Sequence, residues 1–211
     1  MNKAAASDTL LQSAVPSSIR SDAESALLSL GSPELQTTPH LIQDTHTGAS
    51  QRPGILVEGQ LVQIPYRVYF AWPESRRTRH LNHTQLLVLW AWMTRNADGR
   101  IRQEALRKLL QEDAPWTIPY VIQLCGEYVV EIASDILQFL TTELPKRPRL
   151  RQSYSQFIAE NPTFVALTEQ RALSYWNAYD RWRFARDEYP QLAALQLLDD
   201  LRRDSTVKSR N

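Results

Sequence analysis

The most regular set of residues that could do chemistry in this chain is a row of carboxylates. Glu127, Glu131 and Asp135 follow one another at i, i+4 and i+8, so one continuous helix would carry all three on the same face. Like charges at this spacing repel by about 0.2–0.5 kcal/mol per pair. We expect a cation to offset them, first the arginines of the preceding helix, then a basic partner, then a bound metal ion. Acid–base catalysis would also need a nucleophile or a Gly-rich loop nearby, and the sequence contains no recognisable motif of either kind.

Histidine and cysteine do not complete a site. His80 and His83 have i, i+3 spacing, but zinc requires three or four ligands, and neither a His-Glu-x-x-His nor a Cys-x-x-Cys motif occurs. Cys125 stands between Leu124 and Gly126, and we expect it to be a small core residue. The sequence therefore predicts a protein that is not an enzyme and has no metal site and no cofactor.

Aromatic residues and arginines alternate near the C-terminal end. Tyr175, Tyr179 and Trp182 have i, i+4, i+7 spacing, and Arg183 and Arg186 lie among them. Core packing explains part of this cluster, but its arc is wider than one neighbouring helix would bury. The remainder is typical of an interface with aromatic and arginine anchors. Stacking of single-stranded bases is the alternative use, which the acidic residues of the same segment disfavour.

Charge is segregated along the chain, although the net charge is only +1. Residues 71–110 carry a net +5, residues 111–143 carry −6, and residues 144–155 carry +4. Pairing between neighbouring helices is the simplest explanation, and a charged partner is the other. A nucleic-acid role would rest on the basic segments 76–80 and 146–151. Their cations are Arg76, Arg77, Arg79, Lys146, Arg147, Arg149 and Arg151.

These candidate residues lie in a chain whose composition changes sharply. All 19 aromatic residues lie between Tyr66 and Tyr189. Residues 1–53 are rich in Ser, Thr, Ala, Pro and Gly, and we expect a largely disordered tail there, a linker, a secretion signal or an extension, with one short helix at Ser21 to Leu30. Residues 54–203 are predicted to form a single helical domain, and residues 204–211 a frayed end.

The predicted fold class is mainly α with a short β element at residues 55–70. Ile55–Val57 and Leu61–Phe70 read as a hairpin or short strands, and Pro65 indicates an edge strand. Asn82 and Gln85 form a capping-box pattern before an apolar run that predicts a central helix. The next helix, ending at Gln111, places Arg102, Arg107 and Lys108 opposite its apolar stripe.

Further helices are expected after this stripe. One is capped by Thr117 and runs to about Leu140, with Gly126 as a kink, a break or a close contact. A long helix starts at Asn161-Pro162 and continues to about Glu188, and Pro190 starts a shorter one that ends at Leu201.

The stretch from Asp98 to Leu110, followed by Ile118 to Leu124, resembles a HEAT-type helical repeat. It has an Arg-x-x-Ala-Leu core in a first helix, then a loop, then a second helix opened by Pro119. The resemblance covers about residues 98–140 and falls short of the roughly three repeats that such stacks need. It implies a scaffold that binds other macromolecules without catalysis.

A competing pattern, Leu81 to Leu86 with Asp98 to Ile101 and Glu104 to Leu106, resembles the first two helices of a winged-helix domain. The recognition helix would be residues 117–126, which contain no Lys, Arg, Asn, Ser or His. Such a helix is a poor reader of DNA, because base edges and phosphates require donors. We retain a winged-helix-like arrangement of helices as an alternative for the fold and discount DNA binding as the function.

These observations predict an interaction protein. A single cysteine excludes an intramolecular disulfide and favours the cytoplasm. The longest apolar run, Leu86 to Met93, is too short to cross a bilayer, so no membrane association is expected. We expect a protein partner, recognised by the aromatic and arginine helix or by the acidic stripe. The protein would act as an adaptor, a scaffold or an immunity-type inhibitor, with nucleic-acid binding as the alternative.

Overall fold

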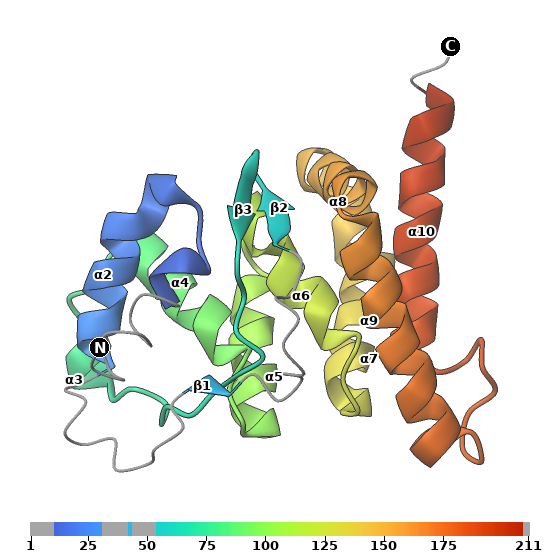
Figure 1. The fold of residues 1–211 in the computed structure, drawn as a ribbon, viewed down its shortest axis with the longest axis horizontal. Helices are drawn as coiled ribbons and strands as arrows, with labels where there is room; N and C mark the ends of the chain where they lie inside the picture. The colour runs from blue at the N-terminus through green and yellow to red at the C-terminus, as the bar shows by residue number, and fades with distance from the viewer. Residues whose placement is uncertain (1–10, 31–41, 44–53, 209–211) are drawn as a thin grey trace. The chain divides into compact units, whose positions relative to one another are not determined.

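The computed structural model describes residues 11–30, 42–43 and 54–208, with the backbone alone for residues 42–43 and 204–208. It is mainly helical and contains two small antiparallel sheets (Figure 1). This confirms the predicted fold class. The chain divides into two compact units, residues 1–109 and 110–211, where the sequence predicted one domain. The boundary falls inside the apolar Leu109-Leu110 pair, close to the point where the net charge changes from +5 over residues 71–110 to −6 over residues 111–143.

The first unit contains short strands and the first helices of the chain. Its elements are η1 (Ser17–Ile19), α2 (Arg20–Ser29), β1 (Ile42–Gln43), β2 (Ile55–Val57), β3 (Gln60–Val62), β4 (Arg67–Val68), α3 (Ser75–Thr78), α4 (His83–Met93) and α5 (Gly99–Leu109).

Residues 11–30 belong to the folded part of this unit, although their composition predicts a largely disordered tail. The short helix expected there is α2, which packs against α4. Leu11, Ala23 and Ala26 are fully buried, and Asp22 Oδ1 accepts hydrogen bonds from Asn82 Nδ2 and Gln85 Nε2, both at 3.2 Å. A few apolar residues suffice here because α4 supplies an apolar surface for them. The rest of the predicted tail, apart from β1, lies outside the described residues.

The predicted hairpin is present. β2 pairs with β3 around Glu58 and Gly59, and both turn residues have positive φ. Glycine adopts this conformation without the steric cost that a side chain brings. The described sheets have two strands each, so β3 is an edge strand, as predicted. Pro65 itself lies between β3 and β4, and Val68 of β4 pairs with Ile42 and forms an isolated bridge with Asn96.

Helix α4 is the core of the first unit, and its predicted capping box is confirmed. Gln85 N donates to Asn82 Oδ1 at 2.9 Å, and Asn82 N donates to Gln85 Oε1 at 3.0 Å. The side chains of Val88 and Trp92 are fully buried. The apolar run therefore forms a central helix, as its composition predicted.

Arg102 of α5 is fully buried, which corrects its predicted place on the solvent side. Its Nη1 donates to the carbonyls of Asn96 at 2.8 Å and Ala97 at 2.9 Å. These carbonyls follow the C-terminal end of α4, where a cation is favourable. Arg95 is also fully buried, and its Nη2 donates to Tyr66 O at 3.0 Å.

The regular elements that the structure describes in the second unit are all helices. Its elements are η3 (Pro115–Thr117), α6 (Ile118–Leu124), α7 (Val130–Gln138), the π-helical turn η4 (Phe139–Glu143), η5 (Leu144–Lys146), α8 (Pro148–Glu160), α9 (Pro162–Tyr175), the π-helical turn η6 (Trp176–Asp180) and α10 (Pro190–Lys208).

The helix predicted from Thr117 to Leu140 is broken at Gly126. A Cβ at Gly126 would lie 3.1 Å from Thr168 Cγ2 and 3.2 Å from Thr168 O, both on α9. Both the break and the close contact therefore occur. The Thr117 side chain does not cap α6, because its Oγ1 donates to Ala114 O at 2.8 Å.

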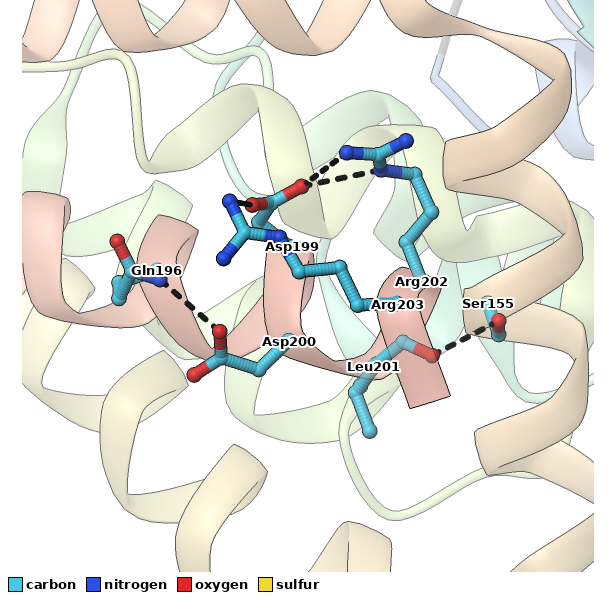
Figure 2. A network of polar contacts seen from close by, with 7 residues as sticks. All are labelled: Ser155, Gln196, Asp199, Asp200, Leu201, Arg202 and Arg203. Carbon is cyan, nitrogen blue, oxygen red and sulfur yellow. Dashed lines mark hydrogen bonds and ion pairs between the residues drawn. The ribbon is translucent and has the colours of Figure 1, made fainter. Parts of the chain in front are cut away.

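Helix α10 packs against α7, α8 and α9 (Figure 1). It runs to Lys208 and so extends past the end predicted at Leu201, through residues that include no proline or glycine. Asp199 supports its C-terminal half by accepting from Arg202 at 2.7 Å and pairing with Arg203 at 2.6 Å (Figure 2). Figure 2 also shows Ser155 Oγ of α8 donating to Leu201 O at 3.1 Å.

Helix α8 is not among the predicted helices, because Pro145 and Pro148 interrupt the helical pattern before it. Pro148 instead occupies the first turn of α8, where its missing N–H costs nothing. Among the helices that the structure describes, none combines the length and the apolar composition needed to cross a membrane.

Candidate binding surface of the second unit

Four aromatic side chains of the second unit form a cluster that reaches the solvent. They are Tyr128, Tyr175, Tyr179 and Trp182, and we refer to them as the aromatic surface. Tyr128, Tyr179 and Trp182 have exposed fractions of 54%, 65% and 81%. Large apolar side chains gathered at the surface are typical of interaction sites, whereas single exposed ones are common and need no explanation.

The rings of the aromatic surface contact one another. Tyr175 and Tyr179 stack with their centroids 6.3 Å apart and 26° between their planes. Tyr128 lies against Tyr175 with a centroid distance of 5.9 Å. The indole Nε1 of Trp182 donates to Tyr179 O at 2.7 Å. The three tyrosines are therefore connected through ring contacts, and Trp182 joins them through a hydrogen bond to the Tyr179 backbone.

The predicted long helix does not continue to Glu188. It ends as the π-helical turn η6, in which Arg181 N donates to Trp176 O at 2.8 Å. π-Helical turns occur frequently at functional sites. The segment that follows η6 contains Trp182 and leads back to α10 as a loop that projects from the helices (Figure 1).

This loop is held by contacts within the unit. Trp176 Nε1 donates to Phe184 O at 3.1 Å. The hydroxyl of Tyr189 donates to Asp180 Oδ2 at 3.3 Å, and its ring packs on Phe184 with a centroid distance of 5.8 Å. Burial and the nearby Asp180 carboxylate raise the pKa of Tyr189 above its usual value, so Tyr189 remains a neutral donor. The loop thus presents Trp182 from an ordered base, which lowers the entropy cost of binding.

The two predicted arginine anchors lie in different environments. The guanidinium of Arg183 is 4.8 Å from the centre of the Phe184 ring. Arg186 lines an open groove of about 750 Å³ along α10, together with Asp187 and Glu169. Arg183 therefore lies beside the aromatic surface, while Arg186 belongs to the groove.

The acidic stripe is not a single face. Glu127 lies in the break before α7 and is 3% exposed, and its backbone carbonyl accepts from Gln191 Nε2 at 3.0 Å. Glu131 is exposed and Asp135 is half-buried, both on α7. The break at Gly126 separates Glu127 from the other two carboxylates, so the predicted three-carboxylate face does not form.

Several cations of the predicted basic segments are paired with carboxylates. Arg76 pairs with Glu74 at 2.5 Å. Lys146 pairs with Glu143 at 2.9 Å and lowers the pKa of that carboxyl by hydrogen bonding and by its charge. Arg147 pairs with Asp113 at 3.4 Å and also donates to Leu110 O at 3.1 Å. Of the remaining members, Arg79 and Arg149 are exposed and Arg77 and Arg151 are half-buried.

Both candidate histidines are at the surface and the cysteine is in the core, as predicted for Cys125. His80 and His83 are exposed, and Cys125 is fully buried. Burial raises the pKa of the Cys125 thiol to about 12, so the thiol is protonated at neutral pH. No group of three His, Cys, Asp or Glu side chains suited to a metal ion occurs within the described residues.

Tyr128 is the member of the aromatic surface that sequence reasoning missed. It lies between α6 and α7, far along the chain from the cluster on α9 and η6. Helical periodicity connects only neighbours on one helix, so no sequence signal links Tyr128 to Tyr175.

No protein-family model, curated protein or solved structure matches this chain.

Proposed function

We propose that this protein acts without catalysis by binding a protein partner through the aromatic surface. The observation that carries the proposal is the connected cluster of Tyr128, Tyr175, Tyr179 and Trp182, of which three side chains are more than half exposed. Tyr and Trp are the side chains most often found at the energetic centres of protein interfaces.

The ring arrangement favours a protein partner over single-stranded nucleic acid. Bases stack on ring faces that are open to the solvent, whereas Tyr175 and Tyr179 already stack on each other. The basic segments add little to a nucleic-acid role, because Arg76, Lys146 and Arg147 pair with carboxylates. The acidic stripe is a weaker protein-binding candidate, since Glu127 is buried.

The proposal is tested by quantitative affinity capture from a lysate of the organism that makes the protein. The full chain is compared with Trp182→Ala and with Leu28→Ala as the matched control, because Leu28 is 82% exposed and lies in the other unit. We expect a defined protein to be retained by the wild type and by Leu28→Ala, and its recovery to fall at least about tenfold with Trp182→Ala.

Equal recovery of the partner with the wild type, Trp182→Ala and Leu28→Ala would contradict the proposal. It would also be contradicted if the wild-type chain captured no protein and instead turned over a substrate. Trp182→Phe separates the ring from its hydrogen bond, because phenylalanine keeps an aromatic face and loses the Nε1 donor to Tyr179 O. We expect Trp182→Phe to retain most of the binding.

A further inference from the structure

Arginines without a carboxylate partner flank the aromatic surface. Arg181 and Arg183 are exposed, and they stand on either side of Trp182 in the sequence. Both guanidinium groups contact neutral groups. Arg181 Nη1 donates to Asn177 Oδ1 at 3.4 Å, and Arg183 lies over the Phe184 ring. Among the described side chains, no carboxylate lies within ion-pair distance of either guanidinium.

Other arginines of the same unit are paired. Arg147 contacts Asp113, and Arg202 and Arg203 share Asp199 (Figure 2). The contrast is local, because Arg202 and Arg203 have a carboxylate three or four residues before them on α10, whereas Arg181 and Arg183 follow only Asp180. The Asp180 side chain already accepts the hydrogen bond of Tyr189.

The charge beside Trp182 in the sequence is therefore positive. Residues 180–183 contain two arginines, Arg181 and Arg183, and one acid, Asp180, whose carboxylate accepts from Tyr189. Asp187 and Glu188 follow at the turn into α10, where Asp187 lines the groove beside that helix. An exposed guanidinium beside an apolar contact gains most from a carboxylate, which it can bind with two parallel hydrogen bonds.

We infer that the aromatic surface recognises an acidic segment of its protein partner, with an apolar or aromatic side chain of that segment on the rings and carboxylates beside Arg181 and Arg183. This inference rests on the proposed function and specifies the chemistry of the partner. Charge of this kind steers encounter and selects partners, while the rings supply most of the affinity.

The test uses the full chain and a library of random peptides displayed on phage. We expect the enriched peptides to carry more Asp and Glu than the input library and to include an aromatic or large aliphatic residue. A labelled synthetic copy of the most enriched peptide is then titrated by fluorescence anisotropy. Trp182→Ala should weaken its binding at least about tenfold, and the double variant Arg181→Gln/Arg183→Gln about three- to tenfold, with a reduced dependence on salt.

Arg100→Gln is the matched control, because Arg100 is also exposed and lies in the first unit. It should leave the affinity unchanged. Circular dichroism of each variant verifies that the fold is intact.

The outcomes separate the inference from the proposed function. Enriched peptides that are neutral or basic, and whose binding still requires Trp182, would overturn the acidic partner and leave the aromatic surface as a protein-binding site. Peptides whose binding does not depend on Trp182 would overturn both. A labelled oligothymidylate that binds the wild type more tightly than any selected peptide, and that is lost with Trp182→Ala, would replace the protein partner with single-stranded nucleic acid.

Discussion

Arg102 is an arginine of an amphipathic helix whose guanidinium lies in the core. Arg102 stands four residues before Leu106 and seven before Leu109, so helical spacing puts it on their face of α5 and not on the solvent side assigned to it from its charge, and it is fully buried. The reason is the chain that leaves α4, whose Asn96 and Ala97 carbonyls accept from Arg102 Nη1. Buried carbonyls require donors, and a long side chain from the next helix supplies them.

Replacement of Arg102 should therefore destabilise the protein strongly. Arg102→Ala leaves two buried carbonyls without this donor and opens a cavity, so we expect the free energy of unfolding to fall by about 2–5 kcal/mol. Urea unfolding followed by circular dichroism measures the change. Arg100→Ala, at an exposed position of the same helix, is the control and should change the free energy of unfolding by less than about 0.5 kcal/mol. An equally small effect of Arg102→Ala would show that the hydrogen bonds of Arg102 do not contribute to stability.

Among the helices, a capping box could be predicted from the sequence because its N-cap and N3 residues belong to the same helix start. Asn82 and Gln85 form the expected reciprocal pair at the start of α4. Thr117 and Asn161 are residue types that also favour helix N-caps. Their side chains donate to Ala114 O and Phe157 O and do not cap the helices that follow. A cap residue has several carbonyl acceptors within reach, and the approach of the preceding chain selects among them.

The break at Gly126 depends on a different element. A Cβ at Gly126 would contact Thr168 Cγ2 at 3.1 Å and Thr168 O at 3.2 Å, closer than ordinary van der Waals packing, so we expect Gly126→Ala to lower the free energy of unfolding by about 1–3 kcal/mol. Thermal unfolding of the single variant measures this loss.

Thr168→Ser provides the matched second change, because serine keeps the hydroxyl that donates to Phe164 O at 2.8 Å and removes Cγ2. The double variant Gly126→Ala/Thr168→Ser should recover part of the lost stability, since the Thr168 carbonyl contact at 3.2 Å remains. No recovery, or no loss in the single variant, would mean that α9 moves away freely at this point.

At the scale of the whole molecule, the second unit buries several neutral acids. Burial raises the pKa of Cys125 from its usual 9.0 to about 12. Burial is also the largest cause that raises the pKa of Tyr154 and of Tyr189 above the usual 10.0. The unfolded chain releases these protons at lower pH than the folded chain, so each group stabilises the folded state fully below its unfolded pKa and progressively less above it.

The protein should therefore lose stability in alkali. From about pH 9 for Cys125 and about pH 10 for the tyrosines, each group lowers the free energy of unfolding by up to about 1.4 kcal/mol per pH unit. Urea titrations between about pH 8 and pH 11 measure the slope. Cys125→Ala should flatten the part that begins near pH 9, and a stability independent of pH over this range would contradict the prediction.

Features that depend on neighbours along the chain could be predicted from the amino-acid sequence. These are the helical class, the β2–β3 hairpin, the cap and apolar character of α4, and the aromatic spacing on α9 and η6. Each is written in a short window, because hydrogen bonds, turns and helical faces connect residues a few positions apart.

Only the tertiary structure decided which distant residues meet and which side chains reach the solvent. It placed Tyr128 against Tyr175, buried Glu127 and Arg102, and packed α2 on α4. It also left Trp182 exposed in the loop that follows η6, which a hydrogen bond from Trp176 to Phe184 O stabilises. Burial depends on what the other elements cover, and covering is a property of the packed chain that no local pattern contains.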